Sequence, residues 1–81
     1  MTTVRLLFLA QSAEWMNQKE MVLNLPHPQH IEEMLQNRKS LAPLWAHRTL
    51  YRVAINHEIV DFKTEVRDGD EVAFLPPYSG G

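Results

Sequence analysis

The first strand-like segment of the chain, VRLLFLA (residues 4–10), is a short apolar run interrupted only by Arg5. Side chains of a β-strand point alternately to its two faces, so the charge of Arg5 marks the face toward water. Leu7 and Leu9 then share this outer face with Arg5. The positions predicted to face the core are Val4, Leu6, Phe8 and Ala10.

A second strand is predicted at residues 21–25, MVLNL, because strand-forming residues follow a polar stretch there. That polar stretch, residues 11–20, is expected to contain a turn around Asn17 and Gln18. The two strands are expected to pair as a hairpin.

The spacing of apolar residues changes from two to three or four in LPHPQHIEEMLQNRKS, residues 25–40. Ile31, Met34 and Leu35 recur at helical spacing, and Pro28 suits a first helical turn because its missing N–H has no helical partner there. The segment predicts an amphipathic helix of about three turns. Its acidic start and basic end, at Arg38, match the helix dipole.

The second half of the chain reads mainly as strands and turns. A short helical turn, interrupted at Pro43, is expected before the next strand because proline cannot continue a helix. The later predicted elements are a strand at 51–55, a turn at 56–57, a short strand at 58–62, a turn at 68–70 and a closing strand at 71–75.

This order of elements predicts an α+β fold. The first and last strands are almost entirely apolar, which favours a place side by side at the centre of a mixed sheet. One main helix then packs on a single face, as in the ubiquitin-like β-grasp fold. Residues 1–75 form one domain in this interpretation, and residues 76–81 form an extended, flexible tail.

A single helix leaves the other face of the sheet uncovered. The alternation predicts seven residues exposed together on it: Arg5, Leu7, Leu9, Arg52, Ala54, Ala73 and Leu75. An apolar patch of this kind often marks a protein interface. The alternative is that a loop covers it, or that it is a set of scattered surface leucines.

Composition narrows the classes of function. The 81 residues include 44% apolar residues and carry a net charge of −2 with a pI near 6.0, which does not favour binding to nucleic acid or to a membrane surface. The absence of cysteine excludes thiolate metal sites and thiol catalysis. The first residues fit neither an export signal nor a membrane span, so a soluble cytoplasmic protein is predicted.

Other side chains with chemical potential have structural interpretations. Four histidines lack ligand spacing, so no metal site is predicted, and His27 and His30 are read as surface or capping residues. Asp68 and Asp70 flank a glycine and are read as turn formers. The two tryptophans, Trp15 and Trp45, are read as core or partly buried residues, with an interface role as the alternative.

The last residues, FLPPYSGG, have an unusual pattern. Pro76 and Pro77 hold the backbone extended, so residues 76–81 can reach about 20 Å from the sheet. Gly80 and Gly81 lack side chains and can enter a narrow tunnel. The reactive group at the tip is the Gly81 carboxylate, which gains a good leaving group when it is joined to AMP; the alternative is a terminus without function.

FLAQ (residues 8–11), DGDEVAFLPP (residues 68–77) and the terminal Gly-Gly resemble the MoaD family, the ubiquitin-like small subunits of molybdopterin synthase. The resemblance implies that an ATP-dependent adenylyltransferase activates Gly81, so that ATP is used by that enzyme and no cofactor is bound here. Sulfur then replaces AMP to give a thiocarboxylate. The large synthase subunit, expected to hold the active site in a heterotetramer, uses this sulfur to convert cyclic pyranopterin monophosphate to molybdopterin.

The resemblance also implies roles for single residues. Gly81 would carry the thiocarboxylate, and the residues that insert with it would be Gly80, Ser79, Tyr78, Pro77 and Pro76. Tyr78 and Ser79 depart from the smaller residues usual in the family. The apolar positions that would meet the large subunit are Leu75 and Ile59, beside Leu7 and Leu9 of the predicted open face.

Two alternatives stay open on the sequence. A sulfur carrier of the thiamine pathway shares the Gly-Gly end but is usually shorter and lacks the two prolines. A β-grasp interaction module or protein modifier would keep its end unmodified or join it to a lysine. No Ser-His-Asp order, phosphate-binding loop or dinucleotide motif is present, so the chain is not expected to be a catalyst on its own. The resemblance implies a non-catalytic, sulfur-donating subunit.

Overall fold

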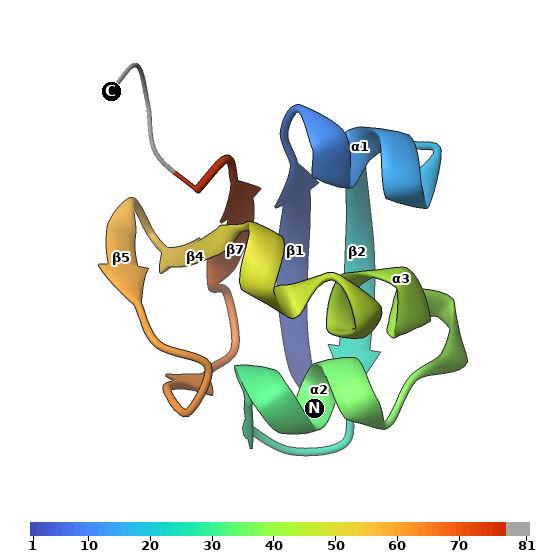
Figure 1. Ribbon diagram of the computed structural model, residues 1–81. Coiled ribbons are helices and arrows are strands. Elements are labelled where there is room, and N and C mark those ends of the chain that lie inside the picture. The colour runs from blue at the N-terminus through green and yellow to red at the C-terminus, as the bar shows by residue number, and fades with distance from the viewer. Residues whose placement is uncertain (78–81) are drawn as a thin grey trace.

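The computed structural model describes residues 1–77; Tyr78 to Gly81 lie outside the described residues. Its main sheet has the strand order β2-β1-β7-β4-β5 (Figure 1). In this order the strands are Glu20–Leu25, Thr2–Phe8, Glu71–Leu75, Arg52–Ile55 and Glu58–Val60. The predicted arrangement, with the first and last strands adjacent in a mixed sheet, is confirmed.

β1 and β7 pair in parallel at the centre of the sheet, and the other pairs are antiparallel. The register places Leu6 beside Val72 and Phe8 beside Phe74, and all four side chains are buried. The strands therefore present one continuous apolar face to the core. Because β7 runs parallel to β1, its end lies at the opposite end of the sheet from Met1 (Figure 1).

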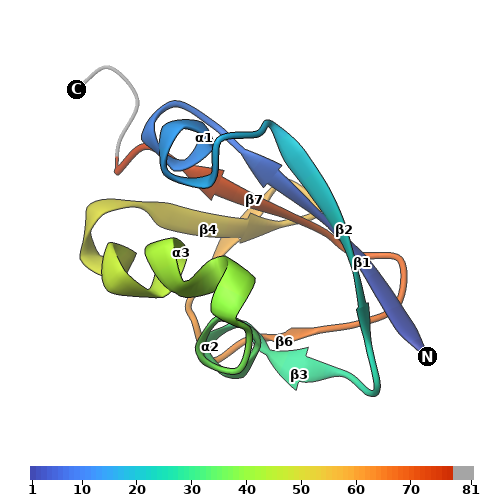
Figure 2. The ribbon, with the colours of Figure 1, turned by 90° about the vertical axis from the view of Figure 1, so that its right-hand side faces the viewer.

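Short helices cover one face of this sheet (Figure 2). Their bounds are Gln11–Met16 for α1, Ile31–Gln36 for α2 and Ala42–Ala46 for α3, with 3-10 turns at Lys39–Leu41 (η1) and Arg48–Leu50 (η2). None of the helices within residues 1–77 is long and apolar enough to cross a membrane. The ubiquitin-like β-grasp class is confirmed, although the helical layer is divided into several pieces.

The predicted three-turn helix is wrong in its bounds. Pro28 lies outside it, because Gln29–His30 (β3) pairs with Glu65–Val66 (β6) in a second, two-stranded sheet. The His30 backbone N–H donates to Glu33 at 3.3 Å, so the helix begins only after this bridge. The three apolar residues that predicted the helix, Ile31, Met34 and Leu35, are fully buried against the sheet.

The segment after β1 also differs from its prediction. Residues 11–16 form α1, where a polar connection was expected. Ala10 is exposed with a positive φ of 55°, so its predicted core position is wrong: the chain has already left the strand. The turn at Asn17 is confirmed, since this residue ends α1 in the left-handed conformation.

The predicted turns in the second half of the chain are confirmed. Asn56 and His57 have positive φ angles of 50° and 75° between β4 and β5. Gly69 has a φ of 88°, a conformation that favours glycine. Asp68 accepts the Thr3 backbone N–H at 2.8 Å and thereby ties this turn to the start of β1.

Tyr51 links the helical layer to the sheet. Its ring lies edge-on to Phe74, with centroids 5.6 Å apart, and its hydroxyl donates to the buried carbonyl of Leu44 at 2.6 Å. Burial raises the pKa of the Tyr51 hydroxyl well above its ordinary value, against a smaller lowering by Arg48, so the hydroxyl stays neutral as a donor.

Ser12 links α1 to the end of the central strand. Its hydroxyl is buried and lies 2.9 Å from the Leu9 carbonyl and 3.0 Å from the Phe74 carbonyl. It also accepts the Leu9 backbone N–H at 2.9 Å. The Ser12 hydroxyl thus connects the start of α1 to the Leu9–Phe74 backbone hydrogen bond, which lies at the end of the β1–β7 pair.

Replacing Tyr51 with phenylalanine is expected to lower the free energy of unfolding by about 1–3 kcal/mol, because the buried Leu44 carbonyl loses its donor. Urea denaturation followed by circular dichroism measures this. Thr49→Val removes an exposed hydroxyl nearby and is expected to change stability by less than about 0.5 kcal/mol. Equal effects of the two substitutions would contradict the prediction.

Ser12→Ala is expected to cost roughly 1 kcal/mol of stability, since three polar contacts of the hydroxyl are lost. Hydrogen exchange at the Leu9 amide is expected to become faster, because this N–H keeps only the longer bond of 3.3 Å to the Phe74 carbonyl. Ser40→Ala, at an exposed position, is the matched control. An unchanged exchange rate at Leu9 would show that the Ser12 hydroxyl does not protect the Leu9 amide.

Candidate functional site

The tail begins at the end of the central strand. Pro76 and Pro77 follow β7 directly and are exposed, in agreement with the prediction that the prolines end the strand. The predicted site residues Tyr78, Ser79, Gly80 and Gly81 lie outside the described residues, so their predicted roles rest on the sequence. What the structure describes is the base from which these residues start.

The uncovered face of the sheet lies beside this base. The strand registers align Leu7 of β1 with Ala73 of β7, Ala73 with Ala54 of β4, and Ala54 with Ile59 of β5. Ile59 is 51% exposed, whereas Leu7 and Ala73 are half-buried. We call this row, with Leu9 and Leu75 nearer the tail, the open-face patch. It brings the four apolar residues of the predicted partner surface onto one side of the molecule.

The expected exposure of Ala54 on this face is wrong: only 3% of its surface is accessible. Its short side chain lies between Ala73 and the larger Ile59 on the two flanking strands, and these neighbours shield it. The other six predicted positions are exposed or half-buried. The row of apolar residues on this face therefore runs across four strands, β1, β7, β4 and β5.

The ion pairs on this face lie toward the end away from the tail. The Arg5 guanidinium lies 3.1 Å from the Glu20 carboxylate and 3.6 Å from that of Glu71, on the two strands beside β1. His57 lies 3.9 Å from Glu71. Arg5 therefore has partners within its own sheet. Arg52, also on this face, is exposed and lies beside Leu75 at the tail end.

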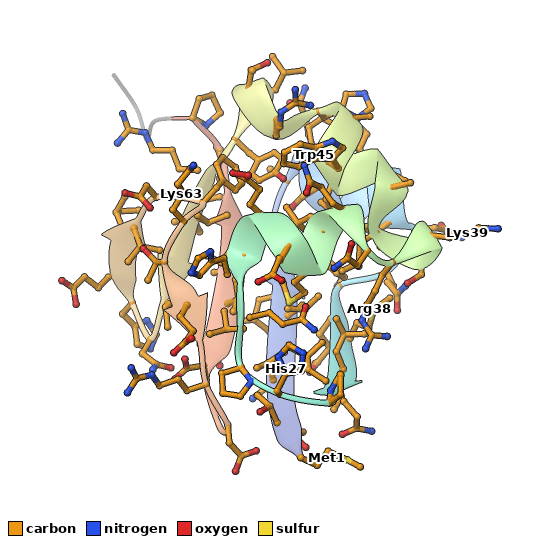
Figure 3. The ribbon with its side chains drawn as sticks, turned by 90° about the horizontal axis from the view of Figure 1, so that it is seen from below. Met1, His27, Arg38, Lys39, Trp45 and Lys63 are labelled. Carbon is orange, nitrogen blue, oxygen red and sulfur yellow. The ribbon has the colours of Figure 1, made fainter. Side chains whose placement is uncertain are left out.

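The helical layer has a different surface. Lys39 extends outward from the connection between α2 and α3, whereas the neighbouring Arg38 donates to the Asn24 carbonyl at 2.8 Å (Figure 3). Trp45 lies on α3. Arg48 stacks over the Trp45 ring at 4.1 Å, and Trp15 stacks on His47 at 4.2 Å. Both tryptophans are half-buried, which confirms their prediction as partly buried residues.

The remaining polar candidates have structural partners. Asp70 accepts the Arg67 backbone N–H at 2.8 Å and the Asn56 side-chain amide at 2.9 Å, so the turn-forming role predicted for the two aspartates is confirmed. His27 contacts the Pro28 carbonyl. Within residues 1–77, no three histidine, aspartate or glutamate side chains are grouped so that they could hold a metal ion.

Ser12 is the residue of this region that sequence reasoning missed. It holds the Phe74 carbonyl, two residues before the first proline of the tail. In the sequence, Ser12 is one small polar residue within residues 11–20, where a connection between strands was predicted. Nothing in that pattern indicates a structural role for its hydroxyl. Its role depends on a contact between residues 62 positions apart.

The sequence is similar to known sulfur carrier proteins over nearly its whole length. The model of the ThiS family matches residues 6–81. The molybdopterin synthase sulfur carrier subunit of Escherichia coli (strain K12) is 31% identical over 81 residues, which cover 96% of this chain and 99% of that protein.

Two solved structures show the same fold. The small archaeal modifier protein 1 of H. volcanii has a TM-score of 0.79 at 16% identity, over 96% of this chain and 100% of that one. A chain from the complex of subunits 1 and 2 of the molybdopterin-converting factor from Helicobacter pylori has a TM-score of 0.64 at 21% identity, over 99% and 100%. Together with the family match, these findings confirm the resemblance to ubiquitin-like sulfur carriers, and the chain belongs to the ThiS family.

Proposed function

We propose that this chain is a sulfur carrier, the small subunit of a molybdopterin synthase. The observation that carries the proposal is the match to a sulfur carrier subunit over nearly the whole length of both proteins. The fold supports it, because the central strand delivers Pro76 and Pro77 to one end of the molecule, beside an apolar face. A body of this kind can bind a partner while its tail reaches into that partner.

The proposed chemistry takes place at Gly81. A carboxylate oxygen attacks the α-phosphorus of ATP on an activating enzyme, and pyrophosphate leaves. A sulfur nucleophile then attacks the acyl carbon and displaces AMP, which gives the thiocarboxylate. Glycine suits both steps because no β-carbon hinders the approach to the acyl carbon. ATP is a substrate of the activating enzyme, an adenylyltransferase, in this scheme.

The thiocarboxylate then donates its sulfur to cyclic pyranopterin monophosphate in the active site of the large subunit. In this proposal the chain contributes the sulfur and its position, and the large subunit contributes the catalytic groups. Two large and two small subunits form the assembly that the family resemblance implies. Support for a large-subunit partner comes from the fold likeness to a chain solved within a complex of two converting-factor subunits.

The open-face patch is the proposed docking surface for the large subunit. Ile59 and Leu9 are 51% and 44% exposed, and burial of such side chains stabilises a complex. The Arg5 ion pairs lie at the far end, whereas the exposed Arg52 lies beside Leu75 at the tail end. A partner that docks there must therefore pair this charge or leave it in water.

Experiments can distinguish the proposed function from the two alternatives that the sequence left open. A carrier of the thiamine pathway would form the same thiocarboxylate, but it would not restore molybdenum-enzyme activity to a strain that lacks its own small subunit. A protein modifier would join its end to a lysine, and intact mass would show a conjugate in place of an exchange of oxygen for sulfur.

Deletion of Gly81, or addition of one residue after it, is expected to abolish sulfur transfer, because the acyl group is then misplaced in the partner. Intact-mass analysis after incubation with ATP, a sulfur source and the activating enzyme measures thiocarboxylate on each variant. A reconstituted synthase assay with the precursor measures sulfur transfer to it.

The control for these two variants is folding. Their circular dichroism spectra and thermal midpoints are expected to equal those of the parent chain, since the described body ends before the changed residues. Parental sulfur transfer by either variant would refute the proposed role of Gly81.

Ile59→Asp is expected to weaken binding of the large subunit at least tenfold, because it places a charge in the apolar open-face patch. Isothermal titration calorimetry measures the dissociation constant. Ala46→Asp introduces the same charge at an exposed position of the helical layer and is expected to change binding less than about twofold. Equal losses for both variants would place the docking surface elsewhere.

A further inference from the structure

A small apolar pocket lies at the base of the tail, next to the open-face patch. Its volume is about 150 Å³. Its walls come from the end of β1, from α1, from the residues before β4 and from the start of the tail. The lining includes Leu9, Ser12, Trp15, Leu50, Tyr51 and Pro76.

The two hydroxyl groups in this lining, those of Ser12 and Tyr51, already have partners. The Ser12 hydroxyl is bonded to the carbonyls of Leu9 and Phe74, and the Tyr51 hydroxyl donates to the carbonyl of Leu44. Neither group needs a hydrogen bond from a ligand. The pocket therefore favours an apolar occupant over a polar metabolite or a water cluster.

The size of the pocket indicates the size of this occupant. An apolar cavity of about 150 Å³ is large enough to take a benzene molecule. The pocket thus matches one aromatic ring or one branched aliphatic side chain.

The walls are held in place by contacts on their outer sides. Trp15 stacks on His47 with ring centroids 4.2 Å apart and an interplanar angle of 14°. Tyr51 packs edge-on against Phe74 and Phe62, with centroids 5.6 Å and 5.8 Å away. A preformed pocket loses little conformational entropy when it is filled, which favours its use as an anchor point.

The position of the pocket points to a protein as the source of the occupant. Leu9 and Leu75 line the pocket, and Leu75 is also the last residue of β7 on the uncovered face, beside Arg52, so the two surfaces meet there. Five large apolar side chains are prominently exposed among the described residues, and Leu9, Leu50 and Ile59 lie along this continuous surface. A partner that covers the open-face patch also reaches the mouth of the pocket at Leu50.

We propose that this pocket receives one aromatic or branched aliphatic side chain from the large subunit, the protein that takes up the tail. The inference rests on the proposed function and deepens it, because it adds an anchor point beyond the sheet face. A side chain held here fixes the partner directly at Pro76, where the tail begins. It would therefore set the position from which the remaining residues enter the partner.

Fluorine NMR with 5-fluorotryptophan incorporated into this chain alone tests the proposal. The chain has two tryptophans: Trp15 lines the pocket, whereas Trp45 lies on the helical layer beside a different groove (Figure 3). Addition of the unlabelled large subunit is expected to shift the Trp15 resonance more than the Trp45 resonance. A complex in which Trp15 keeps its free chemical shift would overturn the proposal.

A pair of substitutions tests the energetic contribution. Leu50→Asp changes a 49% exposed side chain at the pocket mouth, so the fold is expected to persist, and the dissociation constant for the large subunit is expected to rise at least tenfold. Ala46→Asp is the control with the same charge change, expected within about twofold. Less than a threefold rise for Leu50→Asp, with an unchanged circular dichroism spectrum, contradicts the proposal.

The experiment separates this inference from the proposed function. Absence of any complex with the large subunit contradicts both the proposed function and the pocket proposal. A complex in which the Trp15 resonance does not shift contradicts the pocket proposal alone. A shift of Trp15 in the free chain on Tyr78→Gly substitution would assign the pocket to the chain's own tail and would likewise overturn the proposal.

Discussion

The parallel pairing of β1 with β7 is the constraint on which the rest of the molecule depends. It joins residues about 66 positions apart, from Arg5 beside Glu71 to Phe8 beside Phe74, and it places both strands where each has a neighbour on either side. The Asp68 to Gly69 turn fixes the start of this pair, because Thr3 bonds both residues. The Ser12 hydroxyl fixes its end at the Phe74 carbonyl. The base of the tail is therefore set by contacts at both ends of one strand pair.

This central pairing also creates the two surfaces that surround the tail. Alternation along β1 and β7 sends Leu6, Phe8, Val72 and Phe74 into the core and sends Leu7, Ala73 and Leu75 to the uncovered side. The pocket at the tail base is bounded by the same strand ends, together with α1 and Tyr51. The register of β1 against β7 thus determines both which side chains fill the core and where Pro76 leaves the sheet.

The parts of the fold that were predictable are those with a strong local pattern. The strands near residues 4–8 and 71–75, and the turn at Gly69, follow from alternation and turn chemistry, and the family resemblance added the site at the chain end. The short elements were not predictable, because α1 and the β3–β6 bridge depend on distant partners. Ala10 is an example of what the pattern cannot predict. It is apolar, as expected of a strand residue facing the core, but its positive φ angle lies beyond the end of β1. Ser12 and the pocket depend on contacts between separate segments, which no local spacing reveals.

The central place of β7 has a consequence for how the chain matures. During synthesis, the residues of β1 must wait for nearly the whole sequence to emerge before their neighbour in the sheet exists. The β1–β2 pair joins residues that are close in sequence, but the core is incomplete until Phe74 is present. The Gly-Gly end follows within seven residues of Phe74. A polypeptide cut short before residue 71 therefore lacks β7 and the Gly-Gly end together, so a chain without its central strand cannot present that end.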